Sequence, residues 1–327
     1  MSELLPPFDF QKVIVAPWTE GLGTTGWVAL MGFFVTAACG LVGNYLILRR
    51  MALVGDAISH SVLPGIASAF LFTQSRSSGI MFLGALLAGV VTTLLIELIH
   101  KKSRVKQDSA IGIAFTSLFA IGVIMISLFA SKIDLDQECV LYGEIGFVPF
   151  QPMMQLFGWQ VAPTPVAVMG AVMLGTLLLL LLFYKELLVS SFDAGLASSL
   201  GINATAVHYS LMCWLSIVVV SAFESVGAIL VIAMLILPGA TASLLSYRLP
   251  SIHALTLLHA ALSSILGVHL SFWLDCSTAG AMVVMGAVLF TLAWLLSPGQ
   301  GLVGRWLRQR KQRLEAPPEL METVNAR

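Results

Sequence analysis

The chain has 327 residues, of which 58% are apolar and only 10% are charged. Ordinary soluble domains carry about 25% charged residues, so the composition excludes that class and predicts a polytopic membrane protein. Lys and Arg number 17, as do Asp and Glu, and no basic surface for nucleic acid is implied. The four cysteines show no CxxC spacing, so no disulfide framework is indicated.

Four spans are predicted in the first half of the chain. They follow an N-terminal interfacial segment, 1–25, whose aromatic residues are typical anchors at a membrane surface. The predicted spans are 26–48, a helix that begins after Arg50 and reaches Phe72, 79–99, and 110–130. Because basic loops stay in the cytoplasm, the cluster of His, Lys and Arg in 100–106 places that end of the third span inside.

The second span contains two residues that are costly inside a membrane, Asp56 and His60. An Asp at the centre of a membrane helix costs roughly 2.5–3.5 kcal/mol, so it needs a partner or a task. The spacing of four residues puts both side chains on one helical face, where they can converge on a single cation. Pro64 and Gly65, one turn after His60, are predicted to kink or break the helix beside the pair and to loosen the carbonyl of His60. A buried ion pair that only holds helices together is the alternative.

The middle of the chain contains a polar outer segment, one further span and a helix that does not cross the membrane. Residues 131–165 are polar and acidic and fit the outer face, and 166–184 form the next predicted span. The segment 185–202 is too polar to cross the membrane. Apolar residues recur in it at four-residue spacing after Ser190 and Ser191, which predicts a capped amphipathic helix on the cytoplasmic side. Such a helix needs something to bind.

The last third of the chain leaves the number of spans open. The apolar run 209–245 is long enough for two short crossings with Glu224 near the bend. Two further spans, 251–270 and 279–296, precede a basic cytoplasmic tail at 299–327. The sequence therefore predicts nine membrane helices with the N-terminus outside, or eight if the run is not divided.

A second Pro-Gly pair, Pro238 and Gly239, interrupts the run 209–245. The sequence around it, Leu237–Ser243, resembles Leu63–Ala69, and the two predicted spans run in opposite directions. Inverted repeats of this kind occur in transporters, where interrupted helices lie near the substrate path.

No motif of membrane catalysis is found in the sequence. It contains neither the P-loop pattern Gly-x-x-x-x-Gly-Lys-Ser/Thr nor His-Glu-x-x-His, so it does not bind ATP through a P-loop of its own. Transport becomes the leading class. His253, His259 and His269 share one predicted helix but not one face of it, and structural roles are predicted for them.

The segment Leu48–Gly65 resembles the signature of the ABC-3 family, the manganese, zinc and iron ABC-transporter permeases. Three later segments are similar to family segments in the same order: Val140–Glu144, Lys185–Ile202 and Val226–Ala240. The resemblance covers about residues 20–300. One departure is the turn Asp275–Gly280, where a Pro-Ser-Gly-like sequence is expected after the Asp.

This resemblance implies an all-α permease domain over 26–298 in a bacterial inner membrane, with Asp56 and His60 contacting the metal. It implies that the segment 185–202 is the coupling helix toward a separate ABC ATPase. The residues expected to make that contact are Phe192, Asp193, Leu196, Leu200 and Gly201. The further partners implied are an extracytoplasmic metal-binding protein and a second permease copy, either identical or a sister chain.

The expected cargo is manganese, zinc or iron, with no bound cofactor and no catalytic residue. Nitrogen and oxygen ligands suit these ions and are poor ligands for copper(I). The alternative from another class is a proton-coupled secondary transporter or channel, in which Asp56 and His60 form a proton relay. The cytoplasmic amphipathic helix argues against it, because a self-sufficient carrier has no ATPase to bind.

Overall fold

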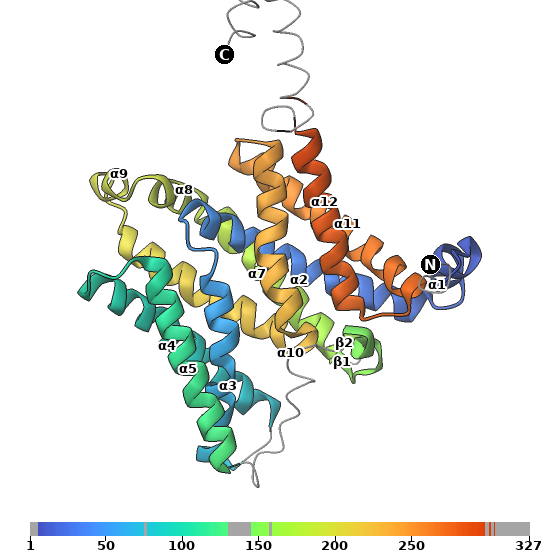
Figure 1. Ribbon diagram of the computed structural model, residues 1–327, viewed down its shortest axis with the longest axis horizontal. Coiled ribbons are helices and arrows are strands. Elements are labelled where there is room, and N and C mark those ends of the chain that lie inside the picture. Colours follow the sequence, from blue (N-terminus) through green and yellow to red (C-terminus); the bar gives the residue numbers. More distant parts are fainter. Residues whose placement is uncertain are drawn as a thin grey trace, which may run out of the picture.

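The computed structural model describes residues 6–74, 77–129, 145–156 and 159–297, together with Gly301 and Gly304. The described chain is almost entirely helical, and Figure 1 shows the long helices crossing one another. These helices are α2 (Leu22–Leu48), α3 (Val54–Thr73), α4 (Ser78–Lys102), α5 (Gln107–Phe129), α7 (Thr164–Leu182), α10 (Ala204–Leu245), α11 (Leu249–Leu274) and α12 (Thr278–Leu296). Among the described residues, 8 helical segments are long and apolar enough to cross a membrane. The predicted all-α polytopic membrane fold is confirmed.

The uncertainty in the number of spans has its origin in α10. This helix bends at Gly227, whose φ of 74° and ψ of 170° belong to a region that is essentially restricted to glycine. The bend lies three residues after Glu224, close to where the sequence places it. The second arm, Leu230–Leu245, is apolar but shorter than the roughly 20 residues of a usual span. The described spans therefore match the lower predicted count.

Residues before α2 form short helices that attach to α11. They are the π-helix η1 (Gln11–Val15) and α1 (Ala16–Thr19). Trp18 Nε1 donates a hydrogen bond of 3.2 Å to His269 Nε2, and Trp273 Nε1 donates one of 3.1 Å to the carbonyl of Pro6. The described part of 1–25 is thus folded against the bundle. Its position at the membrane interface stays a prediction.

A β-hairpin, which the sequence did not predict, precedes α7. Strands β1 (Met153–Leu156) and β2 (Trp159–Pro163) pair antiparallel after the 3-10 helix η2 (Ile145–Phe150). The acidic residues predicted for the outer face fall in 130–144, outside the described residues. The basic tail 299–327 also lies outside them, apart from Gly301 and Gly304.

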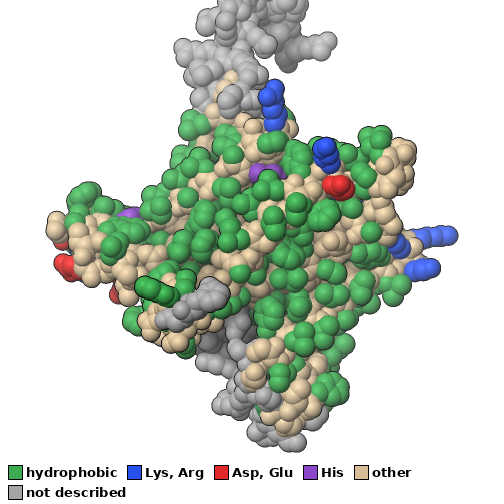
Figure 2. All heavy atoms as spheres, turned by 180° about the vertical axis from the view of Figure 1, so that it is seen from behind, with side chains coloured by type: hydrophobic (Ala, Val, Ile, Leu, Met, Phe, Trp, Pro, Cys, Tyr) green, Lys and Arg blue, Asp and Glu red, His purple; other side chains and the backbone are tan. Residues whose placement is uncertain are grey.

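Helix α2 lies at the centre of the core, in contact with α7, α10 and α11. Of its membrane span 72% is buried, against 22% for the span of α5, so α5 belongs to the outer surface. Figure 2 shows hydrophobic side chains over most of one face, with few charged side chains, which lie toward its ends. This distribution is what a surface in contact with lipid requires.

The predicted helix breaks at the two Pro-Gly pairs are not found. Helix α3 continues through Pro64 and Gly65, and α10 continues through Pro238 and Gly239. Membrane helices tolerate proline because neighbouring groups satisfy the backbone that it leaves unpaired. The prediction treated proline as it behaves in water, whereas the only break inside these two helices is at Gly227.

In α3 the Pro-Gly pair serves close helix packing. A Cβ placed on Gly65 would lie 2.5 Å from the carbonyl oxygen of Gly84 on α4. A Cβ placed on Gly122 of α5 would lie 2.8 Å from Pro64 Cδ. Small residues let membrane helices approach closely enough for backbone contact. Helix α3 is therefore tightly bound to α4 and α5 just beyond His60.

Candidate metal site

Helix α3 brings Asp56 and His60 together as their spacing predicted. Asp56 Oδ1 lies 3.3 Å from His60 Nε2, and the two side chains are 30% and 31% exposed in the isolated chain. Asp56 lies in the first turn of α3, where the helix dipole favours a carboxylate. The pair is thus preformed on one face of the helix and remains open on one side.

Two aromatic residues of α5 hold the imidazole of His60 in place. The ring of Phe115 stacks on it with a centroid distance of 5.4 Å and an interplanar angle of 28°. The ring of Phe119 meets it edge-on at 5.5 Å and 80°. Since α5 therefore fixes the ring orientation, Nε2 stays directed at Asp56.

A single chain supplies too few ligands to enclose an ion. Within the described residues, no group of three or more His, Cys, Asp or Glu side chains could hold a metal. The hydroxyls of Ser59 and Ser61 donate to backbone carbonyls of their own helix, at 3.0 Å and 2.8 Å. Pro64 has no N–H, so the carbonyl oxygen of His60 lacks its usual helical donor. One chain offers one carboxylate, one imidazole and this carbonyl.

The histidines of α11 do not join the pair on α3. His253 Nδ1 lies 3.0 Å from Asn44 Nδ2, and His253 Nε2 lies 3.2 Å from the hydroxyl of Tyr45. His269 holds the N-terminal residues through Trp18, as described above. His259 is 3% exposed and has no hydrogen-bond partner among the described residues. His253 and His269 thus make contacts with other helices, and their structural roles stay a prediction.

The segment predicted as one capped helix at 185–202 consists of two. They are α8 (Tyr184–Phe192) and α9 (Ala194–Ser199). The cap is Asp193, whose Oδ1 accepts hydrogen bonds from the backbone N–H of Gly195 at 2.8 Å and of Leu196 at 3.0 Å. The predicted cap at Ser190 and Ser191 is wrong, because both residues lie inside α8 and their hydroxyls bind Arg49. The two serines that the local sequence pattern assigned to a helix cap instead bind Arg49, a residue distant in the chain.

Three large apolar residues of this segment are exposed in the isolated chain. Phe192 is 68% exposed, Leu196 51% and Leu200 61%. Exposed apolar side chains gathered in one short segment are a typical docking surface for another protein. We refer to these three residues as the α8–α9 surface.

Gly201 ends α9 in a conformation that favours glycine. Its φ is 80°, its N–H binds the carbonyl of Ser198, and the N–H of Ile202 binds the carbonyl of Ala197. This pair of bonds is the Schellman motif, in which the residue after the helix is left-handed. Gly201 thus directs the chain from the α8–α9 surface into α10.

We expect Gly201→Ala to destabilise α9 by about 1 kcal/mol, since a Cβ disfavours the left-handed region. No atom lies within 4 Å of the position of that Cβ, so the effect is conformational and not a clash. Faster hydrogen exchange of the α9 amides in purified protein is the readout. Gly146→Ala is the control, because its Cβ also meets no atom within 4 Å and its φ is not positive. Unchanged exchange in α9 would contradict this account of Gly201.

Sequence reasoning missed a group of charged and polar side chains at the end of the bundle near α8. The sequence pattern assigns no role to Arg49 or His208. In the structure Arg49 Nη1 lies 3.0 Å from His208 Nδ1, and His208 Nε2 lies 3.4 Å from Glu97 Oε2. The only signal in the sequence was that Glu97 lies inside an otherwise apolar run.

Helices of this length and apolarity make the chain a multi-pass membrane protein, and an intramembrane carboxylate beside an imidazole is typical of an ion path. Among such proteins, the chain belongs to the ABC 3 transport family, whose sequence model matches residues 23–297. It is therefore a transport permease. The fold and the family agree on this class.

Relatives with known systems cover nearly the whole chain. It is 43% identical over 282 residues to the manganese transport system membrane protein MntD of Bacillus subtilis (strain 168), which covers 86% of this chain and 95% of the relative. It is 44% identical over 288 residues to the zinc transport system membrane protein TroD of Treponema pallidum (strain Nichols), covering 88% and 78%. The solved structure of PsaBC from Streptococcus pneumoniae in complex with Fab superposes with a TM-score of 0.73 at 33% identity, covering 91% of this chain and 100% of that chain.

Proposed function

We propose that this chain is the permease subunit of an ABC importer for a divalent transition metal, and that the ion passes through a site at Asp56 and His60. The observation that supports the site is the pair itself. A carboxylate and an imidazole lie 3.3 Å apart on one face of a membrane helix and remain partly exposed. Charged residues inside membrane spans are functional far more often than incidental.

A second permease chain completes the ligand set in this proposal. Transition metals in proteins take four to six ligands, and the described residues of one chain bring only two side chains together. Two chains related by a two-fold axis would supply two carboxylates and two imidazoles. The exposed side of the pair is where the second chain would approach.

The described contacts also support an orientation in the bacterial inner membrane. Arg49 at the end of α2 binds Ser190 and Ser191 of α8, so α8 lies at the same end of the bundle as the basic residues after α2. That end is cytoplasmic by the distribution of Lys and Arg. An ATPase would meet the α8–α9 surface there, and a metal-binding protein would deliver the ion at the opposite end.

Manganese or zinc is the cargo we propose. Both suit a set of carboxylate and imidazole ligands, whereas copper(I) prefers sulfur. The relatives reported above are named for manganese and zinc transport. Affinity alone cannot separate these ions, because binding follows the Irving–Williams order more than biological use.

We expect a strain that lacks this chain to grow poorly in metal-depleted medium and to recover with added manganese or zinc. Uptake of labelled manganese or zinc should return with a plasmid copy, and an excess of the other unlabelled ion should compete for the shared site. The control is the same strain supplied with iron. Recovery with iron alone would overturn the proposed cargo.

A further inference from the structure

Arg49 connects three helices at the end of the bundle that holds the α8–α9 surface. It is the residue that ends α2. Its guanidinium donates from Nε to Ser191 Oγ at 3.1 Å and from Nη2 to Ser190 Oγ at 3.0 Å, both on α8. Nη1 donates to a different helix, to His208 Nδ1 of α10 at 3.0 Å. All three guanidinium nitrogens are used.

The network continues through His208 to α4. Arginine has donors only, so the His208 Nδ1 that faces Arg49 must be an acceptor, and the proton of a neutral ring is then on Nε2. That nitrogen faces Glu97 Oε2 at 3.4 Å. Glu97 Oε1 in turn binds Lys101 Nζ at 2.7 Å. Arg49 therefore donates to His208, and the Glu97 carboxylate accepts from both His208 and Lys101.

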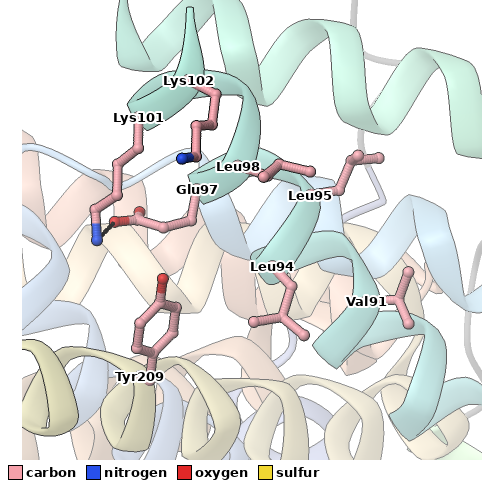
Figure 3. Close-up of a pocket in the computed structure, with 8 residues that line it drawn as sticks. All are labelled: Val91, Leu94, Leu95, Glu97, Leu98, Lys101, Lys102 and Tyr209. Carbon is pink, nitrogen blue, oxygen red and sulfur yellow. Dashed lines mark ion pairs between the residues drawn. The ribbon is translucent and has the colours of Figure 1, made fainter.

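Most of this network is shielded from solvent, but Lys101 at its end is exposed. The side chains of Glu97 and His208 are 10% and 18% exposed, whereas that of Lys101 is 51% exposed. Figure 3 shows Glu97 and Lys101 directed toward Tyr209 across a hollow between α4 and α10. The hollow has a volume of about 470 Å³ and is lined by Glu97, Lys101 and Tyr209, so it borders the exposed end of the network.

The backbone at Arg49 leads directly to the metal site. Arg50 has a φ of 59°, its N–H binds the carbonyl of Ile47, and the N–H of Met51 binds the carbonyl of Leu46 at 2.8 Å. These bonds form a tight Schellman turn. Helix α3 begins at Val54, three residues after Met51. A displacement of the Arg49 backbone therefore reaches the first turn of α3 through a short link that is hydrogen-bonded at its start.

We propose that Arg49 is the positioning residue that transmits movement of α8 to α3, and thereby links ATP hydrolysis to the state of the Asp56–His60 site. The proposal rests on the proposed function, since it assumes that an ATPase displaces α8. A planar guanidinium suits this task because its donors are fixed relative to one another. Helix α8 cannot shift without either moving the α2–α3 turn or losing two hydrogen bonds to a half-buried charge. The His208–Glu97 arm attaches α10 and α4 to the same point.

The test uses the assembled transporter, with the permease, its ATPase and its metal-binding protein in vesicles. Arg49→Gln removes both the charge and the planar set of guanidinium donors, and Arg49→Lys keeps the charge alone. Ser190→Ala combined with Ser191→Ala removes only the α8 contacts and leaves Arg49 on His208. Arg50→Gln is the matched control, because it changes the adjacent, exposed arginine.

We expect the number of ions transported per ATP hydrolysed to fall by about tenfold in Arg49→Gln and by a few-fold in the double serine variant. Co-purification of the ATPase and basal ATP hydrolysis should be retained in both. Arg49→Lys should also assemble normally but should not recover the transport ratio, since a single ammonium cannot bind three acceptors in one plane. Arg50→Gln should match the wild type.

A purely structural role would give a different pattern. The amount of complex would fall, yet each assembled complex would transport the normal number of ions per ATP, and this result would overturn the inference. The double serine variant decides the matter if Arg49→Gln does not assemble, because it removes no charge. The two proposals can fail separately. If a variant of the α8–α9 surface loses ATPase binding while the double serine variant transports the normal number of ions per ATP, the proposed function stands. Only the role of Arg49 is then refuted.

Discussion

Replacing Asp56 by Asn is expected to abolish metal uptake while leaving the permease in the membrane at its normal level. The two side chains have the same shape, and the 30% exposure of Asp56 means that little packing depends on it. The change removes the only carboxylate of the pair. Residues that merely orient a metal ligand cost about 10- to 100-fold when changed, so loss of a direct ligand should reduce uptake by about 100-fold or more.

His60→Ala should have the same effect on uptake through loss of the imidazole. Asp275→Asn is the matched control, because Asp275 is an exposed carboxylate in the turn after α11. Uptake of labelled metal is measured in whole cells alongside the permease content of the membrane. Normal uptake by a well-inserted Asp56→Asn protein would refute the site. Disappearance of either variant from the membrane would instead support a purely structural role for the pair within α3.

The second large effect is expected from Phe192→Asp on the α8–α9 surface. Phe192 is 68% exposed, so the isolated permease should fold normally with this change. In a complex with the ATPase the carboxylate would be buried without a partner, which costs several kcal/mol. We expect co-purification of the ATPase and metal uptake to be lost together. Metal binding at Asp56 and His60 should persist.

Phe150→Asp provides the control for this experiment. Phe150 is 75% exposed and ends η2, three residues before β1, and Figure 1 shows β1 well away from α8 and α9. The same change of charge at that end of the molecule should leave ATPase binding intact. If the Phe192→Asp permease is well expressed and transports normally, the coupling role fails and the proton-driven carrier becomes the better account.

The spans and the ion pair could be predicted from the sequence because both depend on short-range patterns. A membrane span is a continuous apolar run, and the separation of Asp56 from His60 is fixed by helical geometry. The bend of α10 was placed correctly to within three residues by the length of its run. These features need no knowledge of which helices are neighbours.

The features that were missed depend on neighbours far away in the chain. Ser190 and Ser191 have the pattern of a helix cap, but Arg49, more than 140 residues earlier, uses their hydroxyls. Local rules gave Pro64 the strongest signal for a break, whereas Gly227 adopts the non-helical conformation. A membrane helix keeps its backbone where its neighbours compensate for proline, and the sequence does not say where those neighbours are.

The close packing of α3 on α4 and α5 has a consequence for how an ion could be passed on. Gly65 against Gly84, and Pro64 against Gly122, leave no flexible side chain between the backbones to accommodate sliding. The three helices should therefore tilt as one rigid body, with the Asp56–His60 pair and the two phenylalanine rings on α5 retaining their mutual geometry. The ion would then lose affinity not because its own ligands separate, but because the opposing wall of the path withdraws from them.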